Sequence, residues 1–447
     1  MGNDLQAHRL KPALMLILLF IGSLIKASGA LTPTLYPTAN QISGLAMSGK
    51  TLYVTTEVAN DSFFVVFGSD NEGNLSPIGP THTSTGSGAY NPMGAMIASG
   101  GTLYGTGTQQ GQNVAGCVFS VNTNGSGFTV LHTFGNGGGP GPEGGLVLSG
   151  NFLYGTTPAG GNGTNGSVFA LGTDGSFTNL YSFGGGDGSN PQGALVRSGN
   201  TLYGTTSSGG SGNDGTVFAL NTDGSGFTNL YSFHGSNGAN PQAGLSLFAN
   251  RLYGTTSAGG SNNNGTVFAI NKDGTDFQRL HAFAGTNGHA PQCAPVLVGD
   301  KLYGIAPGST ADGCIFFSVN PGGTGFTVLA SNFMSSVIGG LVPCANTTNT
   351  TLFGGGVATF ASIPAAYGFT VPGTLASAIV TMTVALTHTN TLVISWPSPS
   401  TGFTLQQNSN VGTTNWTNVA QTPADNGTTM SVVVPASPGS KFYRLKN

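Results

Sequence analysis

The stretch that decides the fold is GALVRSGNTLYGTTSSGGSGNDGTVFALNTDGSGFTNLYSF, residues 193–233, because it holds four strand-like segments in one repeat. The expected strands are 194–197, 201–206, 216–220 and 227–233. Each is short, rich in apolar, β-branched or aromatic residues, and bounded by Gly, Ser, Asn or Asp. Four short antiparallel strands in one repeat are typical of a propeller blade.

Two local patterns support this reading. Asp223-Gly224 lies between the third and fourth segments, and Asp-Gly readily supplies the positive φ angles of a tight hairpin. Val217 to Leu220 is apolar without alternation. A strand with one solvated face alternates, whereas a strand covered on both faces is a continuous apolar run. The third strand is therefore expected to lie between two neighbouring sheets.

The pattern recurs along most of the chain. A Leu-Tyr or Leu-Phe pair marks each second strand, and the steps between the marks are 51, 50, 49, 50, 50 and 50 residues. The marks are Tyr53, Tyr104, Tyr154, Tyr203, Tyr253, Tyr303 and Phe353. A period near fifty residues is typical of propeller arrays. The sequence therefore predicts an all-β fold with a seven-bladed β-propeller over residues 31–376.

The two ends of the array predict how the ring closes. The seventh copy has no clear fourth strand after its expected third strand at 367–371. Residues 32–37, TPTLYP, precede the first copy and resemble FTNLYS at 227–232. Pairing this N-terminal segment with the last blade would remove two unpaired sheet edges. We therefore expect the N-terminal strand to complete the seventh blade.

The first thirty residues are predicted to be a signal peptide. His8, Arg9 and Lys11 precede an apolar stretch at 13–25, and small residues follow up to Ala30. The alternative is a membrane anchor, but thirteen apolar residues are fewer than the roughly twenty that span a bilayer. We expect a secreted or cell-surface protein with no membrane span after cleavage.

The remainder, residues 377–447, has a sequence pattern that differs from that of the repeats. Segments such as LVISWP at 392–397 and KFYRL at 441–445 indicate five or six strands. Both tryptophans lie here, Trp396 and Trp416. The pattern is similar to a small fibronectin-III-like β-sandwich. A run of small uncharged residues at 373–378 precedes it and is expected to be a linker.

The recurring motifs resemble a known repeat. LYGTT at 202–206, GTVFAI at 265–270 and NTDGSGFTNLYSF at 221–233 are similar to the GloVer tandem repeat of exported bacterial proteins. The first and seventh copies depart from it, since Val54 replaces the motif glycine and no GTVFAL follows Phe353. The resemblance implies an extracellular repeat protein of unassigned activity, and it brings no catalytic residues to this chain.

Composition limits the possible partners. The chain has 75 glycines, only 27 charged side chains of Asp, Glu, Lys and Arg (15 + 12), and a net charge of −3. Without a basic stripe we expect no nucleic-acid partner, and we expect a monomer. No Cys-x-x-Cys or His/Cys cluster is present, so neither a metal nor a cofactor is predicted. Cys293 and Cys314 form either a disulfide or a pair of buried thiols.

The long loops are the candidate binding surface. The connections between strands two and three, and those between blades, are expected on one face, while tight turns occupy the other. The candidate ligand-binding residues on this loop-rich face are Asn162, Asn165, Asp187, Asn213, Asp214, Asn262 and Asn264. The alternative is that Asn, Asp and Gly serve only the turns themselves. That alternative fully explains the hairpin aspartates Asp174, Asp223 and Asp273.

Two functional hypotheses follow. The first is an exported, non-catalytic binding or scaffold protein whose loop-rich face contacts carbohydrate or a cell-surface component, with the C-terminal module as an attachment. The second is a propeller enzyme acting on extracellular polysaccharide, either a glycosidase or a lyase. A glycosidase needs two converging carboxylates, for which Glu143, Asp187 and Asp214 are the candidates. The supply of acid–base groups is thin, so the first hypothesis is favoured.

Overall fold

The computed structural model describes residues 116–135, 141–308 and 313–331 without a break. Elsewhere between Thr34 and Lys446 it describes the strands with short adjoining segments. The predicted signal peptide at 1–30 and the predicted linker at 373–378 lie outside the described residues, so both stay predictions. Among the described residues, no helix is long and apolar enough to cross a membrane.

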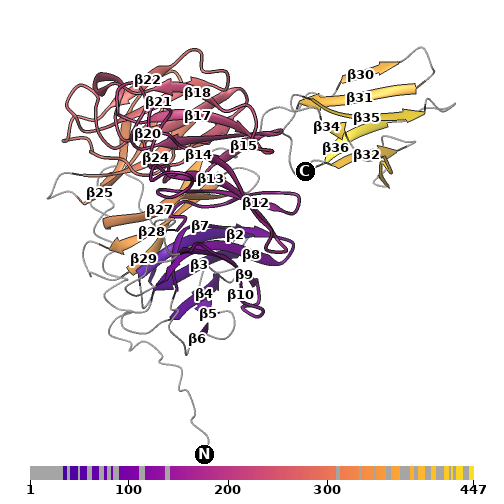
Figure 1. Cartoon of the computed structure of the whole chain (residues 1–447), viewed down its shortest axis with the longest axis horizontal. Coiled ribbons are helices and arrows are strands. Elements are labelled where there is room, and N and C mark those ends of the chain that lie inside the picture. The colour runs from indigo at the N-terminus through magenta and orange to yellow at the C-terminus, as the bar shows by residue number, and fades with distance from the viewer. Residues whose placement is uncertain are drawn as a thin grey trace, which may run out of the picture.

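The described residues from Thr34 to Pro372 form antiparallel sheets that follow the repeat (Figure 1). Their strands, sheet by sheet, are β2 (Gln41–Ser48), β3 (Thr51–Glu57), β4 (Phe63–Ser69) and β5 (Leu75–Pro77), with β6 (His82–Thr83) beside β4; β7 (Tyr90–Ser99), β8 (Thr102–Gln109), β9 (Gly116–Asn122) and β10 (Thr129–Thr133); β11 (Val147–Ser149), β12 (Phe152–Thr157), β13 (Ser167–Gly172) and β14 (Phe177–Ser182); β15 (Val196–Ser198), β16 (Thr201–Thr206), β17 (Thr216–Asn221) and β18 (Thr228–Ser232); β19 (Ser246–Phe248), β20 (Arg251–Thr256), β21 (Thr266–Asn271) and β22 (Gln278–Ala282); β23 (Val296–Val298), β24 (Lys301–Pro307), β25 (Cys314–Val319) and β26 (Thr327–Ser331); and β27 (Met334–Ala345), β28 (Asn349–Ala358), β29 (Pro364–Pro372) and β1 (Thr34–Pro37). We call these sheets blades one to seven in that order.

The expected closure by the N-terminal strand is found. β1 pairs antiparallel with β29, with Leu35 opposite Tyr367 and Tyr36 opposite Ala366. β2 of blade one contacts β7 of blade two and also β27 and β28 of blade seven. The first blade thus lies between the second and the last, which is the arrangement of a closed propeller ring.

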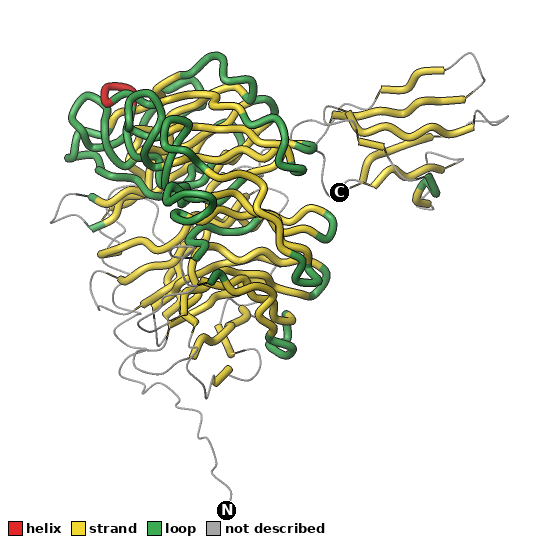
Figure 2. Tube along the Cα trace, in the orientation of Figure 1, coloured by secondary structure: helices red, strands yellow, loops and turns green. Residues whose placement is uncertain are grey.

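The first strands lie on the inside of the ring. β15 contacts β19, and β19 contacts β23, so first strands of successive blades meet one another. In blades three to six these strands have only three residues each, shorter than the four expected at 194–197. Figure 2 shows long loops gathered at one end of these blades and short turns at the other. A short 3₁₀ turn, η1 (Gly235–Asn237), lies among the long loops and was not expected from the sequence.

Each motif glycine in blades two to six makes room for a phenylalanine ring of the next strand. Gly204 of β16 lies opposite Phe218 of β17. A methyl group on Gly204 would come within 2.6 Å of Cζ of Phe218 and 2.7 Å of Cδ2 of Leu195. The equivalent glycine and phenylalanine pairs are Gly105–Phe119, Gly155–Phe169, Gly254–Phe268 and Gly304–Phe317. The LYG and GTVFAL motifs are therefore two halves of one packing unit.

The hydrophobic cores lie between blades. Alternate residues of β17 enter two different cores: Phe218 packs with Tyr154 and Val168 of blade three, whereas Val217 packs with Phe268 of blade five. The first five residues of β17 are all buried. The predicted burial of both faces of the third strand is therefore confirmed. The apolar run lacks alternation because both of its faces supply a core.

Aromatic rings extend these cores to the outer strands. The ring of Tyr181 in blade three stacks on Phe227 of blade four, with centroids 4.0 Å apart and planes 2° from parallel. Phe183 meets Phe218 edge-on at 5.2 Å. The equivalent stacks across the other blade interfaces are His132–Phe177, Tyr231–Phe277 and His281–Phe326. Each such aromatic pair adds about 0.5–1.5 kcal/mol to the free energy of unfolding, beyond the contribution of the apolar area that it buries.

In blades two to five a bulge in the fourth strand fits the hairpin of the next blade. The register of β17 with β18 shifts between Val217 and Phe218, and β13 with β14 shifts at the equivalent place. The shift leaves Leu180 of β14 outside the ladder. Its carbonyl oxygen lies 2.9 Å from the place that a Cβ of Gly224 would occupy, and Gly224 has a φ of +84°. Two constraints therefore favour glycine in this hairpin: the positive φ angle of the turn and the close approach of the neighbouring blade.

Of the two alternatives for Cys293 and Cys314, a disulfide or a pair of buried thiols, the structure has the thiols. Both residues are buried and stay thiols in the structure, as does Cys117. Burial, with a smaller effect of Cys314 nearby, raises the pKa of Cys293 to about 12. Cys314 begins the third strand of blade six, while Cys293 precedes the first strand, and the second strand lies between them. The two cysteines are therefore buried thiols that act as small apolar side chains, which is the other alternative that the sequence left open.

The C-terminal part forms two further antiparallel sheets. One contains β30 (Thr383–Leu386), β31 (Thr391–Pro397), β35 (Thr429–Pro435) and β34 (Ala424–Asp425); the other contains β33 (Thr417–Asn418), β32 (Thr404–Asn408) and β36 (Phe442–Lys446). The buried Ile394 and Leu405 come from different sheets. The predicted strand segments are present, and the likeness to a fibronectin-III module stays a prediction.

Substitution of Gly204 tests the packing unit. Gly204→Ala should destabilise the protein by about 1–3 kcal/mol, because the new methyl group meets the Phe218 ring and Leu195. Thermal unfolding followed by circular dichroism measures the change. Gly186→Ala is the control, since a Cβ there meets nothing within 4 Å. Equal melting temperatures for both variants would contradict the role of the glycine.

Ser318 offers a stabilising change. Its side chain is fully buried and its hydroxyl oxygen has no hydrogen-bond partner among the residues that the structure describes, whereas blades three to five have Ala170, Ala219 and Ala269 at this position. A buried hydroxyl without a partner costs free energy, so Ser318→Ala should stabilise by about 1 kcal/mol. The reciprocal variant Ala269→Ser should destabilise. Chemical denaturation of both measures this, and a destabilised Ser318→Ala would show that the hydroxyl contributes.

Candidate functional site

The loop-rich face consists of two interlocked sets of loops. One set joins strands two and three of a blade, at 158–166, 207–215 and 257–265; the other joins consecutive blades, at 183–195, 233–245 and 283–295. The backbone of Asn190 donates to the carbonyl oxygen of Asn165 at 2.8 Å, and Ser207 donates to that of Asn190 at 3.1 Å. Each connection between blades is therefore held by a loop of its own blade and by a loop of the next.

Asp187 closes a turn within one such connection. Its Oδ1 accepts a hydrogen bond from the backbone of Gly184 at 2.8 Å, and its Oδ2 accepts one from the hydroxyl of Tyr181. Burial, the bond and the charge of Asp187 all raise the pKa of Tyr181. Asp187, a predicted ligand-binding residue, thus ties the connection at 183–195 to the outer strand β14. Asn237 and Asn287 occupy the equivalent positions, and they contact Tyr231 and His281.

Three more of the predicted residues hold loops in shape, and a fourth lies beside a loop glycine. Asn213 has a φ of +57° and accepts from the backbone of Gly209 at 3.2 Å. Asp214 accepts from the backbone of Gly235 at 2.7 Å. Asn165 accepts from the hydroxyl of Ser189 at 3.1 Å, and half-buried Asn264 lies beside Gly285. Asn263, which we did not predict, repeats the contact of Asn213, from its Oδ1 to the backbone of Gly259 at 2.8 Å.

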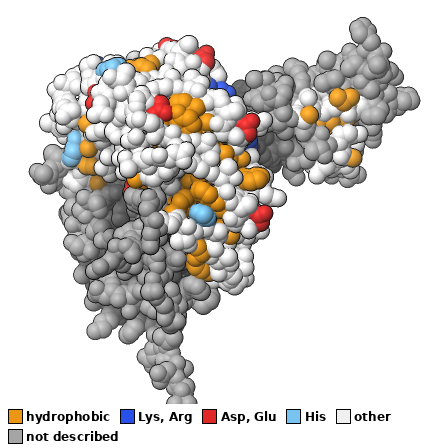
Figure 3. Space-filling model, in the orientation of Figure 1, with side chains coloured by type: hydrophobic (Ala, Val, Ile, Leu, Met, Phe, Trp, Pro, Cys, Tyr) orange, Lys and Arg blue, Asp and Glu red, His pale blue; other side chains and the backbone are white. Residues whose placement is uncertain are grey.

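Asn162 and Asn262 differ from the other five predicted residues. Both are exposed, at the tips of the 158–166 and 257–265 loops. Neither side chain forms a hydrogen bond with the residues that the structure describes. Of the predicted set, these two offer their amides directly to solvent. Figure 3 shows the surface around the loops as largely uncharged, with a few acidic and histidine side chains scattered over it.

The three candidate carboxylates have separate partners. Glu143 accepts a hydrogen bond at 3.1 Å from the amide of Gln192, which lies 49 residues further on at the start of the next blade. Asp187 and Asp214 hold loops, as described above. Gln192 therefore links the connection before blade four to the connection before blade three. Within the described ranges, no group of three or more His, Cys, Asp or Glu side chains could hold a metal ion.

One serine and histidine contact was not expected. Oγ of Ser211 lies 3.4 Å from Nε2 of His234, on the exposed surface. A nucleophilic serine requires a histidine oriented by an acid. Asp214, the nearby acid, bonds the backbone of Gly235 instead. The contact thus lacks the third member of a catalytic triad.

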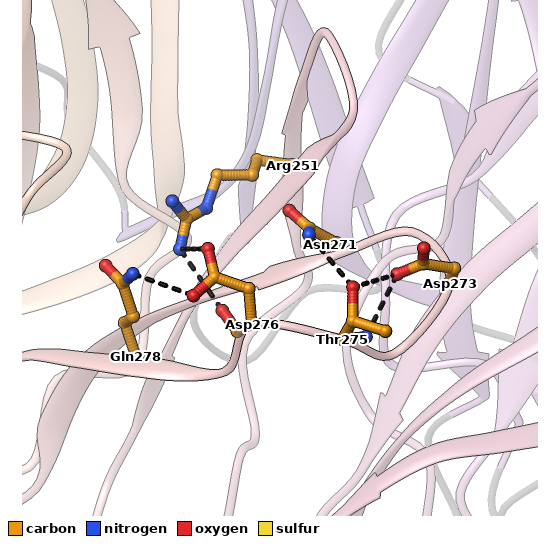
Figure 4. Close-up of polar contacts among 6 residues, drawn as sticks. All are labelled: Arg251, Asn271, Asp273, Thr275, Asp276 and Gln278. Atoms are coloured by element: carbon orange, nitrogen blue, oxygen red, sulfur yellow. Dashed lines mark hydrogen bonds and ion pairs between the residues drawn. The ribbon is translucent and has the colours of Figure 1, made fainter.

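The opposite face carries locked hairpins, shown for blade five in Figure 4. Oδ1 of Asp273 accepts from both the backbone and the hydroxyl of Thr275, at 3.0 and 2.6 Å. Arg251 forms an ion pair at 3.2 Å with Asp276, which also accepts from Gln278. Asp174 and Asp223 repeat the Asp273 arrangement. The turn role predicted for these three aspartates is confirmed.

The chain belongs to the Gloeobacter/Verrucomicrobia repeat family. The family model matches residues 35–213 and 185–362, which together span the propeller blades. The resemblance to this repeat that the sequence motifs indicate is therefore confirmed. No curated protein matches the sequence.

Several solved structures are similar at low identity. A prolyl endopeptidase shares 8% identity and a TM-score of 0.43, and the match covers 81% of this chain but 55% of that one. A quinohemoprotein alcohol dehydrogenase from Comamonas testosteroni shares 10% identity (TM-score 0.47; 80% and 78% covered). A putative 6-phosphogluconolactonase from Bacteroides uniformis shares 14% (TM-score 0.45; 91% and 100% covered). Similarity at this level assigns no activity to the chain.

His281 makes the free energy of unfolding of the protein depend on pH. Oδ1 of Asn287 accepts from the backbone of Ala284 at 2.7 Å, so its Nδ2 faces Nε2 of His281 at 3.2 Å. Only a neutral ring accepts this bond. Burial lowers the pKa of His281 to about 4. Between pH 4 and the ordinary histidine pKa of about 6.5, the unfolded chain binds more protons, so stability rises with pH across that window.

Replacing His281 by the tyrosine of blades three and four tests this dependence. His281→Tyr should remove about 1–2 kcal/mol of the stability lost on acidification through the window, a range discounted for the partial exposure of the ring. The reference is Tyr231, which stacks and bonds Asn237 in the same way. Melting temperatures measured from neutral to acidic pH give the comparison. Parallel curves for the two proteins would exclude His281 as the source.

Proposed function

We propose that this protein is an exported, non-catalytic binding or scaffold protein that uses its loop-rich face to contact carbohydrate or a cell-surface component. One observation carries the proposal: blades three, four and five present similar, uncharged loop tips, each on a base fixed by hydrogen bonds. The tips are residues 161–164, 210–213 and 260–263. Rigid scaffolds that present exposed loops are a common basis for binding.

The fixed base favours binding by reducing the cost of ordering. The amides of Gly209 and Gly259 each donate to the asparagine four residues on, in equivalent positions of two blades. Loops already held in one conformation lose little entropy when a ligand binds. A repeated tip also favours a repeated ligand. Several weak, equivalent contacts to one polymer chain together give strong binding when a rigid frame holds them at a fixed spacing.

The chemistry of the tips favours a neutral, hydroxyl-rich partner. Asn162, Ser211, Ser261 and Asn262 are exposed and uncharged, and amide and hydroxyl groups both donate and accept hydrogen bonds. Sugar hydroxyls do the same. The C-terminal sheets are proposed to attach the propeller to a surface or partner.

A catalytic role receives less support. A glycosidase needs two carboxyl groups that converge on one bond, about 5–10 Å apart. Glu143, Asp187 and Asp214 instead hold three different parts of the loop-rich face together. Carboxylates engaged in loop contacts are explained without chemistry on a substrate.

Binding to polysaccharides immobilised on an array tests the proposal. The combined variant Asn162→Ala, Ser211→Ala and Asn262→Ala should weaken binding to a polymer at least about tenfold, since avidity multiplies the loss at each tip. Short oligosaccharides of the same sugar should bind weakly to both proteins. The control changes Asn200→Ala and Asn250→Ala on the short-turn face should leave the affinity intact. Unchanged binding by the tip variant would place the site elsewhere.

Turnover is the outcome that would contradict a non-catalytic role. Polysaccharide products should be absent from both the parent and the Asp187→Asn and Asp214→Asn variants. Both changes preserve folding, because asparagine already occupies the equivalent positions at Asn237 and Asn264. Turnover that is abolished by either substitution would establish the enzyme hypothesis.

A further inference from the structure

Asparagine followed by glycine is a chemically reactive pair, and the described residues contain six of them. The backbone nitrogen of the glycine can attack Cγ of the asparagine, because glycine has no side chain to restrict the approach. The pairs begin at Asn124, Asn162, Asn165, Asn237, Asn264 and Asn287. Whether each reacts in the folded protein depends on how its two reacting groups are held.

Four pairs have a restrained nucleophile. In each of them the backbone N–H of the glycine donates a hydrogen bond to a carbonyl oxygen of its own turn. These bonds are Gly125 to Asn122 at 2.8 Å, Gly238 to Gly235 at 3.2 Å, Gly265 to Gly259 at 3.0 Å and Gly288 to Gly285 at 3.4 Å. The bond must open before the nitrogen can rotate toward Cγ. The fold therefore slows the reaction at these four positions.

The fifth pair is restrained differently. The side chain of Asn165 accepts a hydrogen bond from the hydroxyl of Ser189 at 3.1 Å. Gly166 is buried, and a Cβ there would come within 2.5 Å of both Thr157 and Pro191. Neither reacting group has room to move.

Asn162 and Gly163 have neither restraint. Both are exposed, and neither the side chain of Asn162 nor the backbone N–H of Gly163 forms a hydrogen bond with the described residues. The nearest atom to a Cβ on Gly163 would be the carbonyl oxygen of Phe183, at 3.9 Å. The backbone N–H of Asn162 is anchored to the hydroxyl of Ser182 at 3.0 Å. The reactive pair is thus free to rotate at the end of an anchored segment.

We propose that Asn162 is a modification site, at which the side-chain amide converts to a carboxylate without an enzyme. The nitrogen of Gly163 forms a bond to Cγ of Asn162, the bond from Cγ to Nδ2 breaks, and the proton of the Gly163 amide leaves with the nitrogen as ammonia. Water then adds to either carbonyl of the cyclic imide and opens it to aspartate or isoaspartate. Solvent supplies the water, and no other reactant is needed.

The conversion would mark one loop tip with a negative charge. Blades four and five carry Ser211 and Ser261 at the position of Asn162 and do not react there. Elsewhere the repeat already accepts both forms: Asp187 stands where other blades have Asn237 and Asn287. Geometry, rather than intolerance of aspartate, is therefore what separates the restrained pairs from Asn162.

Peptide mapping by mass spectrometry tests the proposal on the full-length protein. The folded protein is incubated in neutral buffer at physiological temperature and sampled over time, with products assigned as aspartyl and isoaspartyl peptides. Asn162 should convert at least about five times faster than each of the other five, since those must first break a hydrogen bond or unpack. Asn136 and Asn426 also precede glycine but lie outside the described residues and do not enter the ranking.

Two controls separate structure from sequence. In concentrated urea all six pairs should convert at similar rates, because the restraints are gone. Asn162→Gln and Gly163→Ala, both at an exposed tip, should suppress conversion at this position in the folded protein. Conversion at any of the other five asparagines as fast as at Asn162 in the folded protein would overturn the proposal, as would an Asn162 that converts in urea but not in buffer.

Discussion

In blades two to six a phenylalanine ring of the third strand lies over the glycine of the second strand, and the rest of the blade follows from this contact. The glycine provides the space, since a methyl group at any of the five positions would come within 2.4–2.6 Å of the ring. Across the blade interface the Phe218 ring meets Phe183, which follows β14, and within its own blade it meets Phe227, which precedes β18. Phenylalanine opposite glycine is a known means of recovering packing that a glycine in a strand loses. A blade without the glycine would therefore lose the core that it shares with its neighbour.

Because the cores lie between blades, no described blade has a core of its own. Phe218 and Val217 are adjacent in the chain and belong to different cores. A repeat that buries its apolar faces only against its neighbours is stable only as part of an array, and the terminal repeats are the weak points. The pairing of β1 with β29 and the contact of β2 with β27 remove these ends. Ring closure is therefore a requirement of the way the cores are shared.

Much of this could be predicted from the sequence, and the remainder depends on contacts between repeats. The period, the hairpin at Asp223-Gly224 and the doubly buried third strand are local patterns, and local patterns are visible in one repeat. The bulge at Leu180 is not, because its signal is the fit to Gly224 of the next blade. The candidate ligand residues show the other limit. Asn and Asp are the residues that bind ligands and also the residues that satisfy loop backbones, so composition alone does not distinguish Asn162 from Asn213.

That distinction has a physical basis in how the loops are held. Asp187 and Asn287 perform one task with two side-chain types, because only a hydrogen-bond acceptor at Oδ1 is required by the turn. The second contact varies with the partner: a carboxylate receives the Tyr181 hydroxyl, whereas an amide donates to the neutral ring of His281. Tyrosine in the outer strand pairs with either side-chain type, since Tyr231 accepts from the amide of Asn237, whereas the neutral ring of His281 requires an amide donor. The position that Asn162, Ser211 and Ser261 share at the loop tips closes no turn with its side chain in the described loops, and its residue type varies between blades. A surface of this kind can change what it binds without changing how it folds, which is why the function of such a repeat has to be sought at the tips.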